Sequence, residues 1–446
     1  MKSICLFFQI HQPFKYRRYR FFDIGNDHYY YDDYSNETTI RKIAEKSYLP
    51  TNKLFKKLAA KHKGQFKIAL SISGVTLDLF DLYAPEVIES FKELAHSGCV
   101  EFLAETYSHS LSSLNNREIF EHEVKLHRDK ICSLFGQKPV TFRNTEMIYS
   151  DVIGDWVQKM GFKAILTEGA KQVLGWKSPN FLYVNAINPR MKVLLRNYKL
   201  SDDIAFRFSN HNWSEFPLTA DKYISWLEKL NSREEVINLF LNYESFGLRQ
   251  SHESGIYEFL EHWIDKVVKN DNFLFATPSQ VVQELQPISI VNVPYPISWA
   301  DEERDLTSWL GNEMQKEAFD KLYVLSHKML QCKNIELIKD WNYLQESDHF
   351  YYMSTKYFSG HQNQVYENPF DSPYEAFINY MNILSDFTER LDNEGLNVID
   401  DQANIESLQE IIREKDRKIR TLELELKKYR NSEDNKNYKS GNTDAE

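Results

Sequence analysis

The sequence predicts an α/β protein in which parallel strands alternate with helices and an all-helical segment follows. Over roughly the first 285 residues, apolar runs of strand length alternate with stretches of helical spacing, and after residue 286 only the helical spacing continues. The chain has 446 residues, 42% of them hydrophobic and 27% charged, so it can bury a large core. Alternating strands and helices form a parallel sheet covered on both faces, and about seven repeats favour a barrel over an open sheet.

Short apolar runs predict the strands of this unit. Most are rich in β-branched or aromatic residues, and turn or polar residues flank them. The expected strands are residues 4–10, 66–72, 99–104, 139–143, 164–167, 193–197, 236–241 and 273–277.

Apolar residues at three- and four-residue spacing predict the helices between the strands. The segment after Pro85 is the clearest, because proline suits the first helical turn, residues 87–94 form an apolar face and Gly98 ends the pattern. Further helices are expected from Pro50, at 119–134, 153–160, 220–230 and 256–268 and, beyond the sheet, at 319–330, 335–350 and 373–391.

The change of pattern near residue 286 predicts how the chain is divided. We expect a barrel at residues 1–285 and a helical domain at 286–395. Apolar residues then step by three and four along 405–429, which predicts a coiled-coil helix at 400–430 that could form a homodimer or fold back on its own chain. Residues 431–446 are polar and are predicted to be disordered.

The composition excludes several classes of function. The 54 Lys and Arg against 65 Asp and Glu give a net charge of −11, whereas a nucleic-acid binder should show a basic excess. No stretch approaches the roughly 20 apolar residues of a membrane span, and the run at 4–10 is too short for a signal peptide. The four cysteines include no CxxC pair that would suggest a zinc site. We expect a cytoplasmic protein with no nucleic-acid or membrane partner.

Polar side chains follow the predicted strands at their carboxyl ends, where parallel α/β barrels carry their chemistry. Carboxylates, imidazoles and amides with aromatic rings between them suit a polyhydroxylated ligand, and paired carboxyl groups suit glycosyl transfer. The aromatic content of 14% agrees with such a site. The side chains are His11 and Gln12 after the first strand, Glu105 and His109 after the third, residues 144–146 after the fourth and residues 242–244 after a late strand.

Five ordered segments resemble the five sequence regions of glycoside hydrolase family 57, specifically its α-amylase branch. Their order and spacing match that family over residues 1 to about 320. The resemblance implies an incomplete seven-stranded (β/α) barrel, a helical domain that helps to close the site, and retaining chemistry on α-1,4-glucans without a metal or an organic cofactor. The segments are residues 11–13, 98–109, 142–149, 242–247 and 298–312.

The same resemblance assigns roles to individual residues. Glu146 matches the catalytic nucleophile, and the nearby Arg143 could keep its carboxylate charged. Each of the other positions also has a structural interpretation, such as a core histidine or a solvated helix start. The expected substrate-binding residues are His11, Gln12, Glu105, His109, Arg143, Tyr243, Trp299 and Asp301.

Asn242 departs from the family pattern, because it occupies the position of the general acid/base aspartate. An amide cannot protonate a leaving oxygen near neutral pH, and loss of a general acid/base typically lowers the rate by about 10²- to 10⁴-fold. Glu244, two residues on, could substitute if the strand continued. Two functions therefore stay open: a retaining hydrolase or transglycosylase with a non-standard acid/base, and a non-catalytic α-glucan-binding or regulatory pseudoenzyme on the same fold.

A metal-dependent polysaccharide deacetylase is a third interpretation, and the sequence disfavours it. Such an enzyme needs a His-x-x-x-His pair and an Asp-Asp turn at the first strand. Here His109 has no histidine four residues on, and the first strand ends in His11-Gln12.

Overall fold

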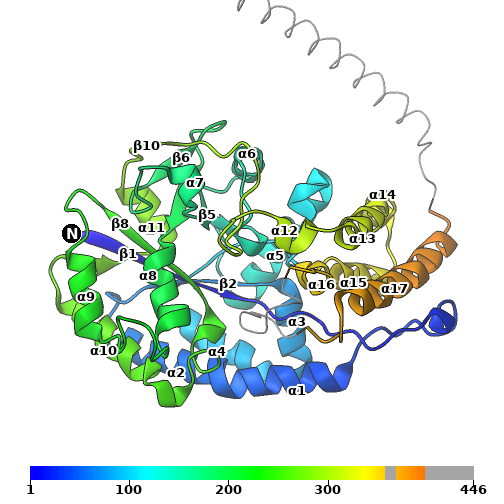
Figure 1. Ribbon diagram of the computed structural model, residues 1–446, viewed down its shortest axis with the longest axis horizontal. Coiled ribbons are helices and arrows are strands. Elements are labelled where there is room, and N and C mark those ends of the chain that lie inside the picture. The colour runs from blue at the N-terminus through cyan, green and yellow to red at the C-terminus, as the bar shows by residue number, and fades with distance from the viewer. Residues whose placement is uncertain (357–367, 397–446) are drawn as a thin grey trace, which may run out of the picture. The chain divides into compact units, whose positions relative to one another are not determined.

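A computed structural model of the chain describes residues 1–356 and 368–396 (Figure 1). Residues Met1–Glu394 form one compact unit, and the fold below is that of this unit. The predicted coiled-coil helix at 400–430 and the tail at 431–446 lie outside the described residues. Within the described part, no helix is both long and apolar enough to cross a membrane.

Two sheets form the centre of the unit. The first follows the order β3-β2-β1-β8, with β9 also paired to β1, and all its pairings are parallel. The second follows the order β10-β6-β7-β5-β4 and is parallel except where β6 pairs with β7. The strands are β1 Lys2–Ile10, β2 Ile68–Ile72, β3 Val100–Phe102, β4 Thr141–Arg143, β5 Ala164–Glu168, β6 Tyr183–Asn185, β7 Lys192–Arg196, β8 Val236–Asn242, β9 Phe273–Phe275 and β10 Ser289–Val291.

The edges of the two sheets meet on both sides. Beyond β3, Ala104 forms a parallel bridge with Phe142 of β4. At the other side, the amide of Asn197 after β7 donates to the carbonyl of Asn238 in β8 at 2.9 Å. The strands thus follow one another around a common interior, which gives an α/β barrel-like domain.

Inward-facing positions along the strands form an apolar layer with a polar layer above it. Phe7, Leu103, Leu166, Leu194 and Phe240 belong to one buried hydrophobic cluster. Because alternate residues of a strand share a face, the next inward position on each strand lies two residues nearer the carboxyl end. The polar residues at these positions are Gln9, Glu105, Glu168, Arg196 and Asn242.

Helices surround the strands, and those predicted by spacing are confirmed. Pro85 stands in the first turn of α4, and α5 ends at Gly136, whose φ of 67° is left-handed. Figure 1 shows α2, α4, α9 and α10 along one side of the β1–β8 sheet. The longer helices of this part are α1 Asp33–Ile43, α2 Leu49–His62, α3 Gly74–Tyr83, α4 Pro85–His96, α5 Arg117–Phe135, α6 Asp151–Lys159, α9 Ala220–Glu228 and α10 Ile256–Lys269.

The chain after β10 is helical, as predicted, and its contacts run back to the first strand. The ring of Tyr343 stacks on Phe14 with centroids 3.7 Å apart. Residues on both sides of position 286 belong to one compact unit. The division into a barrel and a helical domain at this position therefore stays a prediction. The helices are α12 Thr307–Leu310, α13 Glu313–Val324, α14 Ser326–Gln331, α15 Ile335–Leu344, α16 Ser347–Tyr352 and α17 Pro373–Asn393.

The single helix predicted at 335–350 is wrong, because the chain breaks between α15 and α16. Glu346 has an extended conformation with φ −57° and ψ 131°, and it forms a β-bridge with Ser110. The break turns the side chains of Gln345, Glu346 and Asp348 into the interior, where all three are buried. This interruption brings two carboxyl groups to the carboxyl end of β1.

Candidate active site

Glu146 lies in the short turn after β4 and is held in an unusual backbone conformation. Its φ of 53° is left-handed, and Met147 follows at 55°. Only 4% of Glu146 is exposed. His109 Nε2 lies 3.0 Å from Glu146 Oε1, and Trp299 Nε1 donates to Oε2 at 2.6 Å. Each oxygen of this carboxylate therefore faces a ring nitrogen, and the two contacts fix its orientation.

His109 joins Glu146 to a second buried carboxylate. Its Nδ1 lies 3.0 Å from Glu105 Oε2. Burial lowers the pKa of His109, but the hydrogen bonds with Glu105 and Glu146 outweigh burial, so the pKa is raised. An imidazolium can donate from both nitrogens, which is what two flanking carboxylates require.

Glu105 is ionised despite complete burial. Burial raises its pKa, but Arg143 and His109 lower it further, to about 2. Arg143 Nη1 lies 3.5 Å from Glu105 Oε2, and Ser71 Oγ donates to Oε1 at 2.5 Å. Of the expected substrate-binding residues, Glu105 thus holds His109, and Arg143 in turn pairs with Glu105.

His11 packs against one face of the His109 ring. The two rings stack with centroids 3.8 Å apart at an angle of 16°. The Nδ1 atom of His11 lies 2.7 Å from Ser73 Oγ, and Nε2 lies 2.8 Å from Asp348 Oδ2. Burial and the charge of His109 lower the pKa of His11. With both nitrogens engaged, His11 acts in this arrangement as a support for His109.

Asp348 and Glu346 are site residues that the sequence analysis missed. Asp348 follows Leu337, Trp341 and Leu344 at helical spacing, so it continues the buried stripe of α15 with a charge. A charged residue on an apolar stripe was the available signal. It did not indicate the partner, because His11 is 337 residues away in sequence.

Trp299 packs beside a group of charged residues that the sequence did not predict as part of the site. The guanidinium of Arg196 lies 5.6 Å from the centre of the Trp299 ring. Arg196 also pairs with Glu168 at 3.2 Å and with Asp202 at 2.5 Å. The Trp299 amide donates to the backbone oxygen of Glu146 at 3.2 Å, so backbone and side chain both hold the tryptophan at the carboxylate.

Asn242 ends β8 and faces the barrel interior. It is in register with Gln9 of β1, and Phe240 two residues earlier belongs to the interior cluster. Among the described residues, neither Asn242 Oδ1 nor Gln9 Oε1 has a hydrogen-bond partner, and the same holds for Nε and Nη2 of Arg143. Leaving such a buried group unpaired costs about 1–3 kcal/mol, which marks this layer as one where water or a ligand supplies partners.

Glu244 does not share the face of Asn242, because the strand ends and a 3₁₀ turn, Tyr243–Ser245, follows. Its side chain instead meets Tyr48 and Gln12. Tyr48 donates to Glu244 Oε1 at 2.5 Å, and Gln12 Nε2 lies 3.4 Å from the same oxygen. Burial raises the pKa of Glu244 to about 7. The condition under which Glu244 would share the face of Asn242, a continued strand, is therefore not met, although the carboxyl group titrates near neutral pH.

Two other predicted residues have hydrogen bonds and packing contacts with residues other than Glu146. Tyr243 is fully buried, donates from its hydroxyl to Asn52 and packs edge-on against Phe8, 5.4 Å between centroids. Asp301, with a left-handed φ of 51°, accepts from Ser308 and forms a 3.1 Å ion pair with Lys356. Their described contacts place Tyr243 in the core and Asp301 near the α12 segment.

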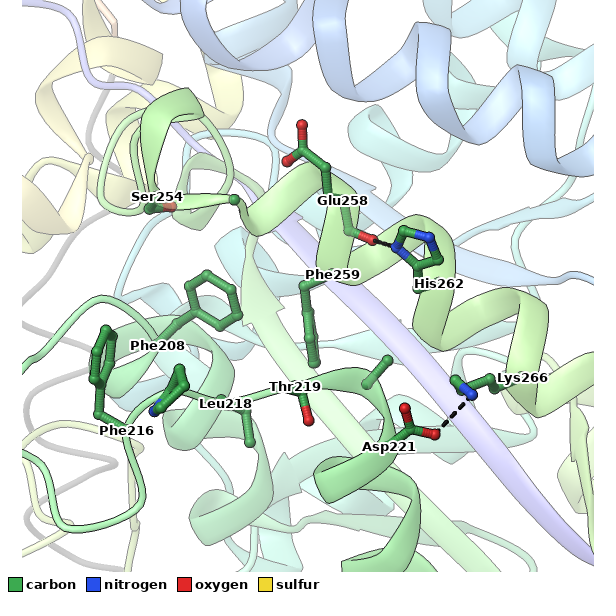
Figure 2. A pocket seen from close by; sticks show the side chains of 13 residues that line it. Phe208, Phe216, Leu218, Thr219, Asp221, Ser254, Glu258, Phe259, His262 and Lys266 are labelled. Carbon is green, nitrogen blue, oxygen red and sulfur yellow. Dashed lines mark hydrogen bonds and ion pairs between the residues drawn. The ribbon is translucent and has the colours of Figure 1, made fainter.

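A separate pocket of about 410 Å³ lies between the loop before α9 and the start of α10 (Figure 2). Its apolar side is formed by Phe208, Leu218 and Phe259, and Asp221 and Lys266 form a 2.6 Å ion pair at its edge. None of the predicted site residues lines this pocket. It is therefore distinct from the Glu146 cluster.

Comparisons by sequence identify a matching family model and a relative of this chain. The family model "Glycosyl hydrolase family 57" matches residues 5–294. A protein of Methanocaldococcus jannaschii named "Putative alpha-amylase" is 40% identical over 393 residues, which cover 85% of this chain and 83% of that protein.

Solved structures share the fold. A GH57 branching enzyme from Thermococcus kodakaraensis matches with a TM-score of 0.66 and 14% identity, over 88% of this chain and 90% of that chain. A 4-alpha-glucanotransferase from Thermococcus litoralis matches with a TM-score of 0.64 and 15% identity, over 86% of this chain. The match spans 59% of the glucanotransferase, so that chain extends well beyond it.

Proposed function

Because the chain belongs to glycosyl hydrolase family 57, we propose that it is a retaining glycoside hydrolase or transglycosylase that acts on α-1,4-glucans, with Glu146 as its nucleophile. The observation that carries the proposal is the contact of each Glu146 oxygen with a ring nitrogen, of His109 on one side and Trp299 on the other. Contacts of this kind hold a nucleophile in one orientation for attack.

In this proposal the strands β1, β2, β3, β4, β5, β7 and β8 make up an incomplete seven-stranded (β/α) barrel with the site at its carboxyl ends. Two contacts that join the edges of the two sheets support this barrel. They are the β-bridge between Ala104 and Phe142 and the backbone hydrogen bond from Asn197 to Asn238. The helical segment closes the site through Asp348. A cytoplasmic location and the pairing of two chains through 405–429 remain predictions from the sequence.

The proposed reaction begins with attack of a Glu146 oxygen on the anomeric carbon. The bond from that carbon to the leaving oxygen breaks, and a glycosyl-enzyme ester forms. As the ester forms, the carboxylate loses its negative charge, while the His109 imidazolium keeps its contact with Glu105. Water or an acceptor hydroxyl then displaces the ester, with overall retention of configuration.

Proton transfer is the step that Asn242 cannot perform, and we assign it to Glu244. A general acid/base works best when its pKa lies near the working pH, and burial raises the pKa of Glu244 to about 7. Glu244 keeps part of its surface exposed. In this assignment Tyr48 and Gln12 hold the carboxyl group in position.

The proposal is tested with an aryl α-maltoside whose good leaving group needs no general acid. Wild-type protein should release a burst of aryl product, and Glu146→Gln should abolish it. Glu253→Gln, a change at a surface carboxyl group, is the matched control and should leave the burst intact. No burst from wild-type protein at any substrate concentration would overturn the assignment of the nucleophile.

Asn242 itself favours a second candidate, a non-catalytic α-glucan-binding protein. Its carbonyl oxygen is unpartnered among the described residues and available to a bound sugar hydroxyl. This candidate predicts binding of maltooligosaccharides by calorimetry without an aryl burst. Asn242→Asp separates the two functions further, because it should raise glucan turnover by about 10²- to 10⁴-fold only where a working nucleophile is present.

A further inference from the structure

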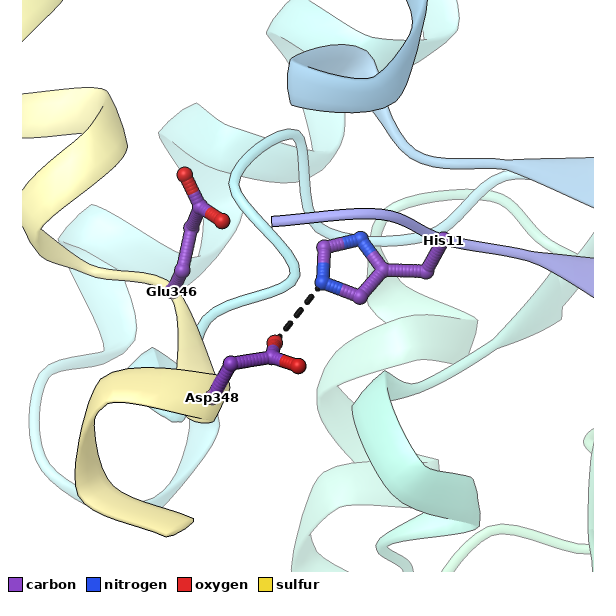
Figure 3. Close-up of side chains that lie close together, drawn as sticks. All are labelled: His11, Glu346 and Asp348. Atoms are coloured by element: carbon purple, nitrogen blue, oxygen red, sulfur yellow. Dashed lines mark hydrogen bonds and ion pairs between the residues drawn. The ribbon is translucent and has the colours of Figure 1, made fainter. Parts of the chain in front are cut away.

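Three buried metal-ligating side chains meet where the helical segment touches the end of β1. Ligand atoms of His11, Glu346 and Asp348 all lie within 4.8 Å of one another. Their exposed fractions are 3%, 0% and 3%. Figure 3 shows both carboxyl groups on the same side of the His11 ring, Glu346 projecting from the segment before α16 and Asp348 from the first turn of that helix.

One carboxyl oxygen of Glu346 is buried without a hydrogen-bond partner among the described residues. Its Oε2 accepts the backbone N–H of Phe14 at 3.0 Å, while Oε1 is buried and has no hydrogen-bond partner among the described residues. Two buried carboxyl groups beside each other are stable as anions only when a cation lies between them.

A chain of hydroxyl groups allows His11 to act as a ligand. Its Nδ1 lies 2.7 Å from Ser73 Oγ, which lies 2.7 Å from Thr76 Oγ1, and Thr76 can donate to the carbonyl of Gln12 at 3.2 Å. Each hydroxyl both donates and accepts, so the chain can run from Nδ1–H to that carbonyl. In this direction Nε2 carries no proton, and this is the form of imidazole that binds a metal.

The charge of the group also fits a divalent ion. A neutral imidazole with two ionised carboxylates carries a charge of −2. The neighbouring imidazolium of His109 directs both its N–H groups to Glu105 and Glu146 and none to this group. One divalent cation would neutralise the group.

We propose that His11, Glu346 and Asp348 form a binding site for a divalent transition-metal ion of the Zn²⁺ or Mn²⁺ class. An imidazole with two carboxylates is a donor set that suits these ions. Binding at Nε2 replaces the hydrogen bond with Asp348, and the imidazole proton passes from Nε2 to Nδ1, so that neutral His11 releases no net proton. The ion joins the α15–α16 segment to the end of β1 and holds the ring that stacks on His109. The proposal is independent of the enzymatic activity.

The test uses tag-free, full-length protein stripped with a chelator and titrated with Mn²⁺ or Zn²⁺ alone. Elemental analysis after desalting should find one ion per chain, and Tm should rise by about 3 °C or more at saturation. Glu346→Gln should lose the ion and the rise in Tm. Ser73→Ala, which removes the partner of Nδ1, should weaken binding by about 10- to 100-fold.

Asp265→Asn is the matched control, because His62 and Asp265 form a histidine–carboxylate contact of 2.6 Å elsewhere in the fold. This variant should bind the ion as wild type does. Failure of wild-type protein to bind one ion per chain, or undiminished binding by Glu346→Gln, overturns the proposal. If circular dichroism shows that Glu346→Gln does not fold, the wild-type titration and Ser73→Ala decide. Ion stoichiometry is measured without substrate, so its outcome is separate from that of the aryl burst.

Discussion

At the scale of single residues, the site concentrates buried charge and backbone strain around one carboxylate. His109, Glu146 and Met147 all have φ values between 51° and 55°, a region that non-glycine residues rarely occupy. Such conformations cost of order 1–3 kcal/mol each and are retained where the surroundings over-determine them. Here the surroundings are the paired contacts of His109 with Glu105 and Glu146, and the bond from Trp299.

Glu105→Gln tests the charge network through stability. The pKa of Glu105 falls from 4.5 to about 2 in the folded protein, so ionised Glu105 stabilises the fold fully above about pH 4.5, and the contribution is lost as pH falls toward 2. We expect the variant to lose about 3 kcal/mol of unfolding free energy at pH 7. Its stability should also change less between pH 4.5 and 2, as urea titrations at a series of pH values would measure. Equal acid sensitivity in both proteins would contradict this account.

Glu244→Gln tests the proposed acid/base through the pH dependence of turnover. A general acid must be protonated, and burial raises the pKa of Glu244 to about 7, so wild-type kcat/KM on glucans should fall as pH rises above 7. The variant should lose this limb and be slower by about 10²- to 10⁴-fold. The burst from an aryl maltoside should be unaffected, because its leaving group needs no proton. An unchanged limb in the variant would assign the proton transfer to another group.

At the scale of elements, periodicity predicted most strands and helices of the barrel but missed the short or exceptional ones. β6 and β10 are three residues each and were not predicted, whereas the equally short β3, β4 and β9 lie within longer apolar runs that were. The interruption at Gln345–Glu346 was missed because the flanking residues keep helical spacing on both sides. Its cause is tertiary, since the bridge to Ser110 and the contact of Asp348 with His11 involve distant parts of the chain.

The same distinction applies to the site. Position at strand ends was enough to select His109 and Glu146, which the structure brings together at 3.0 Å. Tyr243 was selected by adjacency to Asn242, yet the turn after β8 directs its ring into the core. Sequence neighbours share an environment only while the strand continues, and β8 ends at Asn242.

Gly247→Ala tests the turn that follows β8. This glycine has a φ of 90°, and a Cβ atom there would overlap the backbone oxygen of Lys46. Gly64, with a φ of 86° and nothing within 4 Å of such an atom, is the matched control. Alanine at 64 bears only the conformational cost of about 1 kcal/mol, so we expect a clearly larger loss at 247, measured by thermal unfolding. Equal losses of stability at positions 64 and 247 would mean that the approach of the Lys46 backbone oxygen to Gly247 does not determine this turn.

At the scale of the whole molecule, residues after the first barrel strand pack against the later helices. Aromatic residues after β1 pack on the helical segment: Phe14 stacks on Tyr343, and Tyr16 stacks on His349 at 4.3 Å between centroids. Polar contacts follow the same boundary, as Asp348 contacts His11. The aromatic side chains of the loop after β1 are therefore packed against residues beyond 286, although the sequence pattern changes at residue 286.

Truncation at the predicted boundary tests whether the barrel residues 1–285 depend on the helical segment. A chain that ends at residue 285 would expose the faces of Phe14 and Tyr16 and would lack the contact of Asp348 with His11. We expect it to lose native near-ultraviolet circular dichroism and maltooligosaccharide binding, because both its aromatic packing and its site are incomplete. A chain that ends at residue 396 retains the whole compact unit and is the control, with Tm within about 3 °C of full length. Cooperative unfolding of the shorter chain with glucan binding intact would show that the barrel folds alone, and the helical segment would then be an accessory to the site rather than part of it.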